Sequence, residues 1–193
     1  MNKETRLFKN DLLESMTHVH PAIPAILWLP FIGYLLYTQL LEGHSLGNWA
    51  FYSFLGLLVW TLTEYVFHRF IFHFSAESKL GKWLVFAFHG LHHDDPQNPT
   101  RLVMPPVPAM IYTSLLYVIF SFFISREYLN LFFAFFLLGY LTYDYIHFYT
   151  HHGKGKNKVG KFLKNYHLDH HFRDQSKKYG VSSPLWDYVF RTR

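Results

Sequence analysis

Cysteine is absent from this chain of 193 residues, which removes several kinds of chemistry at once. Without cysteine there is no disulfide, no thiolate metal site and no cysteine nucleophile, and an internal iron–sulfur centre is excluded as well. Charged residues are also scarce, at 16%, whereas half of the residues are hydrophobic and aromatic residues alone make up 21%. This composition is too apolar for a typical soluble domain of this size.

A cleavable signal peptide is not expected either. Residues 1–16 are polar and charged, and no apolar segment follows a basic start. We therefore treat the chain as mature protein and expect one domain. The formal net charge of +5 alone would allow nucleic acid as a partner, but the placement of the basic residues argues for membrane topology instead.

Four apolar stretches predict the fold. A helix needs roughly 20 residues to cross the hydrocarbon layer, and backbone within lipid must satisfy its own hydrogen bonds, so the stretches are expected to be helices. The prediction is an all-α integral membrane protein with four transmembrane helices in two hairpins and a cytosolic helical cap. The expected spans are residues 22–41, 46–67, 107–124 and 128–148, after a cytosolic N-terminal segment, 1–21, and within one membrane domain, 22–193, whose cap is 68–106 and 149–193.

Basic residues predict which ends of the helices face the cytoplasm. Of the 18 lysines and arginines, 17 fall in the N-terminal segment, the middle segment and the tail, and only Arg126 lies on the other side. The excess of basic residues in cytoplasmic segments then places both termini and the middle segment in the cytoplasm. A soluble helical bundle is the alternative, but a run such as residues 131–141 (LFFAFFLLGYL) is apolar all round rather than amphipathic.

Ten of the 14 histidines form a pattern on the side assigned to the cytoplasm. Two HxxHH motifs occupy residues 89–93 and 167–171, and helical residues three or four apart share one face. Each motif also presents two neighbouring rings at different angles, so one motif can serve two ions. The ten are His68, His73, His89, His92, His93, His147, His151, His167, His170 and His171.

These histidines predict a site for two metal ions. Imidazole suits iron, zinc and copper, and five rings per ion exceed the four ligands usual for zinc. His68 and His73 are five residues apart, which fits one face of a regular helix poorly, so either they bind different ions or the helix ends between them. His18, His20 and His44 are interpreted as structural or interfacial, and His152 is ambiguous.

Ligand histidines usually donate their second ring N–H to a carboxylate or a carbonyl. Acidic residues near the motifs are candidates for this role or for extra ligands. They are Glu64, Asp144 and Asp169, with Asp94 and Asp95 also adjacent. Tyr143 is a further candidate for supporting a ligand histidine, and with Tyr65 and Tyr149 it is also a candidate for lining the substrate access route or for the membrane interface.

At these residues the chain resembles a known family. The sequences EYVFHRFIFH, HGLHH, RLVMPPVPA, LLGYLTYDYIHFYTHHG, YHLDHHF and GVSSPLWDYVF are similar to those of the fatty acid hydroxylase and sterol desaturase superfamily, and most of all to fatty acid 2-hydroxylases. The resemblance covers about residues 64–190.

The resemblance implies a function and a cofactor. It implies hydroxylation at carbon 2 of a fatty acyl chain, which several members carry on a sphingolipid, with dioxygen as cosubstrate. It also implies two iron ions held by the ten histidines, although zinc can take their place in a purified sample, and no catalytic residue separate from the ligands. Eukaryotic members often carry a b-type cytochrome domain, but only about 21 residues precede the first expected helix here. A separate b-type cytochrome or ferredoxin with its reductase is therefore the expected electron donor.

Two other readings stay open. A sterol or carotenoid oxidase or an acyl desaturase would use a similar site, but the RLVMPPVPA and GVSSPLWDYVF matches favour the 2-hydroxylase. A metal transporter is the second alternative. Transport sites usually lie near the middle of the bilayer, whereas the expected span 107–124 has no charged residue or histidine and the other histidines gather at one face.

Overall fold

A computed structural model describes residues 5–193 of the chain, and in this part every regular element is a helix. The elements are α1 (Asp11–Ser15), α2 (Ile23–Leu41), α3 (Leu46–Phe67), η1 (His68–Phe72), α4 (Lys79–Val85), η2 (Phe86–Gly90), α5 (Leu91–Asp94), α6 (Pro106–Phe120), α7 (Arg126–His152), α8 (Lys158–Phe172) and α9 (Leu185–Val189). The two elements η1 and η2 are short π-helices, in which the backbone bonds from residue i to residue i+5.

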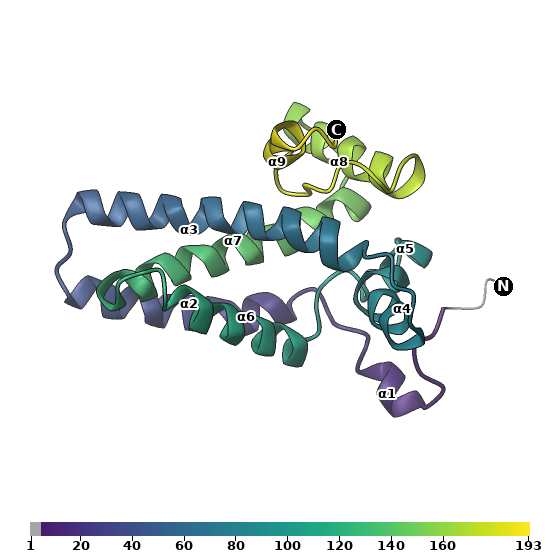
Figure 1. Cartoon of the computed structure of the whole chain (residues 1–193), viewed down its shortest axis with the longest axis horizontal. Coiled ribbons are helices and arrows are strands. Elements are labelled where there is room, and N and C mark those ends of the chain that lie inside the picture. The colour runs from purple at the N-terminus through teal and green to yellow at the C-terminus, as the bar shows by residue number, and fades with distance from the viewer. Residues whose placement is uncertain (1–4) are drawn as a thin grey trace.

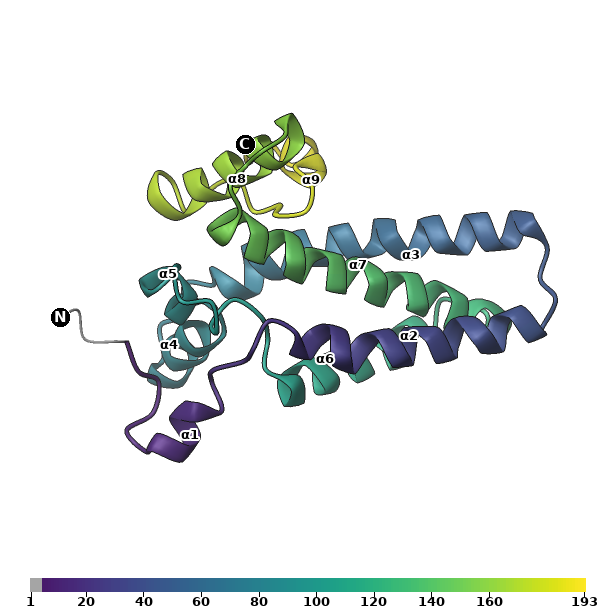
Figure 2. The same ribbon diagram turned by 180° about the vertical axis from the view of Figure 1, so that it is seen from behind.

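The long helices form a bundle around α7 (Figures 1 and 2). Three helices are long and apolar enough to cross a membrane, namely Ile23–Leu41, Leu46–Phe72 and Arg126–His152. The first two and the last of the four expected spans thus coincide with long helices. The third does not reach that length, because α6 ends at Phe120 and has only 15 residues. At 1.5 Å per residue it spans about 22 Å, short of the ~30 Å hydrocarbon layer.

Aromatic side chains and small residues hold the bundle together. Gly56 of α3 faces α7 so closely that a Cβ atom there would lie 2.4 Å from the carbonyl oxygen of Phe132. Trp60 packs beside Gly139 and against the rings of Phe136 and Tyr140, 5.3 and 5.2 Å away between centroids. This packing fixes α3, which leads directly into His68, against α7, which contains His147 and His151.

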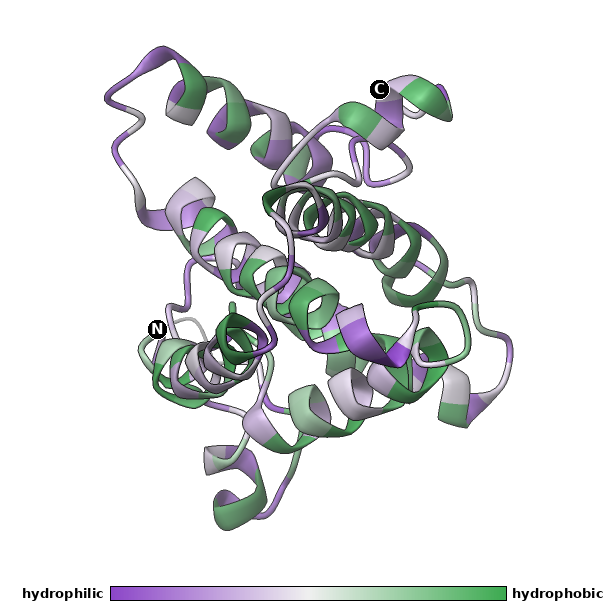
Figure 3. Ribbon diagram, turned by 90° about the vertical axis from the view of Figure 1, so that its left-hand side faces the viewer, coloured by the Kyte–Doolittle hydropathy of each residue, from purple (hydrophilic) through white to green (hydrophobic). Residues whose placement is uncertain are grey.

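The outer surface of the bundle is apolar. Large hydrophobic side chains such as Ile26, Leu40, Phe54 and Ile111 are more than half exposed. Viewed end-on, hydrophobic residues lie on outward-facing as well as inward-facing sides of the long helices, and hydrophilic residues gather in the loops and the C-terminal tail (Figure 3). Exposure of this apolar surface to water would be unfavourable, whereas its contact with lipid would not. The chain is therefore a membrane protein.

The remaining helices gather at the end of the bundle opposite the α2–α3 turn (Figure 1). There α4, η2 and α5 follow η1, and α8 and α9 follow α7. Because α7 is continuous to His152, it brings His147 and His151 from the bundle to this end. The cap therefore receives histidines from four parts of the sequence.

Candidate metal centre

The structure gathers the ten histidines of the sequence pattern into two groups of five. Within each group, one ring nitrogen from every histidine lies within 4.8 Å of all the others. The outer group is defined as His68, His73, His89, His93 and His170, and the inner group as His92, His147, His151, His167 and His171. All five histidines of the inner group are buried, whereas His73 and His93 of the outer group are partly exposed.

A π-turn explains how His68 and His73 reach the same group. The backbone N–H of His73 donates to the carbonyl of His68, 3.2 Å away, which is an i to i+5 bond. This wider turn brings residues five apart onto one face, and the two ring centroids lie 5.1 Å apart. Of the two sequence alternatives, different groups for the two residues are therefore wrong, whereas the helix does end between them, at Phe72, in a last turn that contains one extra residue.

Each HxxHH motif is divided between the groups. In the first motif His89 and His93 belong to the outer group and His92 to the inner one, and in the second motif His170 belongs to the outer group while His167 and His171 belong to the inner one. The rings of His92 and His93 point to different groups because adjacent residues on a helix face different directions. The two groups therefore lie side by side, with two helices shared between them.

Hydrogen bonding alone does not account for the way the rings converge. In the inner group the Nε2 atoms form a chain of four short separations: His147–His92 2.9 Å, His92–His171 3.0 Å, His171–His167 3.0 Å and His167–His151 2.9 Å. An imidazole nitrogen has either one proton or one lone pair, so each can take part in one hydrogen bond. Five atoms therefore allow two hydrogen bonds, not four. Lone pairs that all point at one cation remove the conflict.

The separations also indicate the kind of cation site. Nitrogen ligands at about 2.1 Å from an ion are about 3.0 Å apart when they stand at right angles and about 3.4 Å apart in a tetrahedron. In the outer group the short Nε2 separations are 3.1 Å for His68–His89, 2.9 Å for His89–His93 and 3.0 Å for His73–His170. Both groups thus match ligands at right angles, as in five- or six-coordinate sites, and the residues present fit a pair of metal ions.

Two backbone carbonyls hold rings of the outer group. The Nδ1–H of His68 donates to the carbonyl oxygen of Tyr179, at 2.5 Å, and that of His170 donates to the carbonyl oxygen of Lys177, at 2.6 Å. A carbonyl can only accept, so Nδ1 carries the proton and Nε2 keeps its lone pair for an ion. Neither Lys177 nor Tyr179 was predicted from the sequence, because a backbone acceptor leaves no residue-type signal.

Two of the acidic candidates near the motifs, Glu64 and Asp169, hydrogen-bond to groups other than the ligand rings. Glu64 accepts hydrogen bonds from the backbone N–H groups of Val181 and Ser182, at 2.6 and 2.8 Å, and from the Ser182 hydroxyl. It therefore holds the loop that carries Tyr179 and does not hydrogen-bond an imidazole directly. Asp169 forms an ion pair with Lys178 at 2.5 Å.

Six Nδ1 atoms have no hydrogen-bond partner among residues 5–193, namely those of His92, His93, His147, His151, His167 and His171.

Asp144 and Tyr143 lie beside the inner group. Asp144 is 2% exposed, and its Oδ2 atom has no hydrogen-bond partner among the described residues. The ring of Tyr143 stacks on that of His147, with centroids 5.7 Å apart. Both residues line an apolar cavity that reaches the histidines, whereas Tyr65 and Tyr149 do not.

The four histidines outside the pattern stay outside both groups. His18 lies 2.6 Å from the Thr100 hydroxyl through its Nδ1 atom, and His20 lines the cavity with it. His44, at the other end of the bundle, lies 3.2 Å from the Gln39 side chain. His152 is exposed at the end of α7.

Burial keeps the cap histidines neutral. Burial first, and neighbouring imidazoles, His170 above all, second, lower the pKa of His73 to about 4 and that of His93 to about 3. The pKa of His89, His92 and His167 is lowered well below the usual value, again chiefly by burial and next by neighbouring rings. At neutral pH these rings therefore have free lone pairs, which metal ligation requires.

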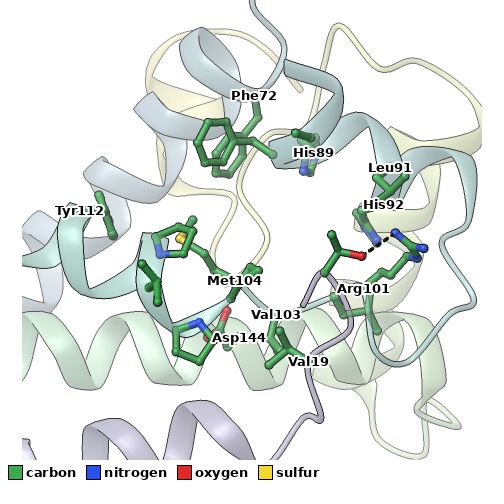
Figure 4. A pocket seen from close by; sticks show the side chains of 18 of the residues that line it. Val19, Phe72, His89, Leu91, His92, Arg101, Val103, Met104, Tyr112 and Asp144 are labelled. Atoms are coloured by element: carbon green, nitrogen blue, oxygen red, sulfur yellow. Dashed lines mark hydrogen bonds between the residues drawn. The ribbon is translucent and has the colours of Figure 1, made fainter. Parts of the chain in front are cut away.

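One cavity of about 940 Å³ reaches both histidine groups. Its wall includes His89 of the outer group and His92 and His147 of the inner group, and the rest is mostly apolar, with residues from the N-terminal segment, α3, α4, α6 and α7. In Figure 4, His89 and His92 lie on one side of the cavity, and Val19 and Asp144 lie on the other. The volume is at the upper end of the range for ligand pockets, ~300–1,000 Å³.

The N-terminal segment forms part of this wall. Glu14 of α1 is buried and pairs with Arg101, whose Nη2 atom is 2.6 Å from the Glu14 carboxylate. The same carboxylate accepts the backbone N–H groups of Leu7 and Phe8. The pair therefore ties residues 7–20 to the segment before α6, and both segments line the cavity.

Comparison with known proteins decides the family. The model of the family described as fatty acid hydroxylase matches residues 53–192. The chain belongs to the fatty acid hydroxylase family. It is 39% identical over 188 residues to a dihydroceramide fatty acyl 2-hydroxylase of Arabidopsis thaliana, which covers 97% of this chain and 79% of that protein. It is 34% identical over 215 residues to the fatty acid 2-hydroxylase of Homo sapiens, of which it spans 57%.

A solved structure shows the same fold. This hydroxylase superimposes with a TM-score of 0.89 on the structure of full-length scs7p in which only the hydroxylase domain is visible. The two are 36% identical, and the match covers 96% of this chain and 70% of the other. The family expected from the sequence motifs is thus confirmed, and the chain is an enzyme of the hydroxylase class.

Proposed function

We propose that this hydroxylase inserts one oxygen atom from dioxygen at carbon 2 of a lipid acyl chain. The observation that carries the proposal is an apolar cavity whose wall includes histidines of both groups. An acyl chain fits such a cavity better than a polar substrate does. The related proteins named for action on fatty acids or on dihydroceramide supply the substrate class, a free fatty acid or an acyl chain on a sphingolipid.

The ten histidines would hold two iron ions, five rings to each. Bound iron supplies the activation of dioxygen and the electron transfer chemistry. The overall reaction converts the acyl C–H bond, dioxygen, two electrons and two protons into C–OH and water. Five nitrogen donors per ion exceed the four usual for structural zinc, so zinc in a purified sample would be a substitute rather than the working metal.

The side chains around the cavity determine which carbon reacts. The cavity is apolar except near the histidines, Asp144, Glu64 and the Arg101 segment. The hydrocarbon tail would lie among the apolar residues, which excludes water from it. The carbonyl end would lie beside Asp144 and Tyr143, next to His147. A carbon close to the carbonyl is then held nearest the histidine groups, which favours carbon 2 over a carbon in mid-chain.

The proposed topology has four spans in two hairpins, α2 with α3 and α6 with α7. The cap, both termini and the histidine groups would lie in the cytoplasm. Supporting this arrangement, the basic residues of the chain fall almost entirely at the end of the bundle where the cap lies, with Arg126 at the other end. One of those basic residues, Lys3, is outside the described residues. The segment 121–125 lengthens the apolar part of α6 enough for a short span.

Lipid analysis tests the proposed reaction. The protein is expressed with a reductase and a b-type cytochrome in a host that lacks 2-hydroxylated lipids, and the lipids are analysed by mass spectrometry. A gain of one oxygen at carbon 2 of acyl chains supports the proposal. A new double bond, or an oxygenated sterol with unchanged acyl chains, would show a different oxidase activity.

Substitution of the histidines links the product to the metal. His89→Ala and His170→Ala should each abolish the hydroxylated lipid and lower iron content, because each removes a ring from the outer group. His152→Ala is the matched control, since His152 is exposed and belongs to neither group. Iron should restore activity to metal-free enzyme and zinc should not. Full activity in both group variants would refute the proposal.

A further inference from the structure

The positive charge of the chain is concentrated after α7. Residues 153–193 contain ten lysines and arginines against three aspartates, a net charge of +7, whereas the whole chain carries +5. One of the three aspartates, Asp187, is fully buried. The exposed surface of the tail is therefore more basic than its composition indicates, and such a surface attracts acidic partners.

Part of this surface forms a small hollow between the loop after α8 and the C-terminal residue. The hollow has a volume of about 290 Å³ and is lined by Asp169, Arg173, Asp174, Lys177, Lys178 and Arg193. Both carboxylates already have lysine partners, Asp169 with Lys178 at 2.5 Å and Asp174 with Lys177 at 3.9 Å. Arg173 has no carboxylate partner among residues 5–193, so its guanidinium group is available to pair with a carboxylate of another molecule.

The backbone of the same loop holds the outer histidine group. Lys177 presents its side chain to the hollow, and its carbonyl oxygen accepts the Nδ1–H of His170 at 2.6 Å. Two residues further on, the carbonyl oxygen of Tyr179 accepts the Nδ1–H of His68. A single peptide unit and one hydrogen bond therefore lead from the basic hollow to a candidate metal ligand.

The outer group is also the more accessible of the two. Two of its five rings are partly exposed, and none in the inner group is. The substrate cavity reaches the histidines from the side of α4, α6 and the N-terminal segment, and none of the six residues that line the hollow lines that cavity. Substrate and a second protein would thus have separate approaches.

We propose that the basic hollow formed by Arg173, Lys177, Lys178 and Arg193 docks an acidic one-electron carrier protein. Electrons enter the outer group through the Lys177 carbonyl and the His170 ring. The inference rests on the proposed function, in which each turnover consumes two electrons. Two carrier molecules each give up one electron and leave oxidised by one, and the two protons needed to form water come from solvent.

A protein fits this hollow better than a lipid headgroup does. The loop after α8 lies at the end of the tail that points away from the α2–α3 turn, and both opposite views agree on this (Figures 1 and 2). That position faces solvent when the bundle spans the bilayer. Interfaces between electron-transfer proteins are small, below about 1,200 Å², and complementary charge controls their association rates.

Charge reversal tests the docking surface in metal-free protein. The double variant Arg173→Glu with Lys177→Glu changes side chains but retains the Lys177 carbonyl. Lys178 is left unchanged because it pairs with Asp169 and has a positive φ of 59°. The control is Lys154→Glu with Lys158→Glu, both exposed and at the other end of α8. Each protein is placed in nanodiscs of neutral lipid and titrated with an acidic b-type cytochrome or an acidic ferredoxin.

The wild type and the control should both bind the carrier, and this binding should weaken as the salt concentration rises. The affinity of the Arg173/Lys177 variant should be lower by a factor of about ten or more. In iron-loaded protein, reduction by the carrier should slow by a similar factor, whereas reduction by dithionite should not change. Equal binding in the variant, a loss confined to the Lys154/Lys158 control, or an effect seen only with anionic lipid would overturn the proposal. Failure of the proposed function would give a different result from failure of the docking proposal. In that case the carrier would still bind and reduce the wild type, but no hydroxylated lipid would form.

Discussion

His68 and His73 are held in one group by a π-turn, with their ring centroids 5.1 Å apart although five residues separate them in the sequence. Inserting one alanine after Ile71, which is exposed, should put His73 six positions after His68 instead of five. His73 would then rotate by about 100° out of the outer group. We expect the insertion variant to lose the metal of the outer group and its hydroxylase activity, while the metal of the inner group stays bound.

The measurement for this insertion is iron per protein after anaerobic loading. The wild type should bind two ions and the insertion variant one. Ile71→Ala is the control, because it keeps the length of the turn and changes only an exposed side chain. Two ions in the insertion variant would show that the length of this turn does not place His73.

The Glu64 carboxylate organises the C-terminal loop, so its removal should act on the outer group from a distance. Glu64→Ala would leave the N–H groups of Val181 and Ser182 without their acceptor, at a cost of about 1–3 kcal/mol. We expect a lower melting temperature and faster amide exchange at residues 179–182. Glu127→Ala is the control, because that side chain is 59% exposed, and an equal effect of both substitutions would contradict the role of Glu64.

Metal-free protein should lose stability in acid because of the buried histidines. The pKa of His73 is lowered to about 4 and that of His93 to about 3, from an ordinary value near 6.5. Between pH 6.5 and about pH 3 the unfolded chain binds protons at these histidines that the folded chain does not. The free energy of unfolding is therefore highest above pH 6.5 and falls as the pH drops toward 3. Melting temperatures of metal-free protein in detergent between pH 8 and pH 4 check this, and His93→Gln should flatten the profile.

Much of the fold and the histidine set could be predicted because their signals are local. Apolar runs long enough to cross lipid gave the positions of α2, α3 and α7, and the family assignment from motifs such as HGLHH is confirmed by the comparisons. The spacing within each HxxHH motif depends only on helix geometry. The division of His92 and His93 between groups follows from the same geometry, since adjacent side chains face different directions.

Other features could not be predicted because they depend on contacts between distant segments or on backbone atoms. A π-turn needs one extra residue that no residue type marks, so the common group of His68 and His73 was not predicted, although a helix end between them was. The Tyr179 carbonyl that holds His68 lies 111 residues away in the chain. Glu64 is four residues before His68 yet bonds to the C-terminal loop. Its partners there are backbone N–H groups, which have no signal in the sequence.

The Glu14–Arg101 pair offers a test of the N-terminal wall of the cavity. Both side chains are buried, and removing one partner of a buried pair costs about 3–5 kcal/mol. Glu14→Ala should therefore release residues 7–20 and expose them to protease, while iron content stays unchanged. The exposed pair Arg6–Asp11 is the matched control, since Asp11→Ala should cost about 1 kcal/mol or less. Unchanged proteolysis in Glu14→Ala would show that the pair does not secure the segment.

Asp144 should affect the substrate and not the metal. Its carboxylate lies one helical turn before His147 in the cavity wall, and its Oδ2 atom has no hydrogen-bond partner among the described residues. A buried oxygen without a partner is costly, so a polar group at the carbonyl end of the lipid would satisfy it. Asp144→Asn keeps the shape but replaces one acceptor with a donor. We expect kcat/KM for acyl hydroxylation to fall by about tenfold or more, corresponding to about 1.4 kcal/mol, with two iron ions still bound. Glu127→Gln, whose side chain is exposed and lines neither the cavity nor the hollow, is the control for a general effect of losing a carboxylate. Loss of iron in Asp144→Asn would instead identify the aspartate as a support of the inner group.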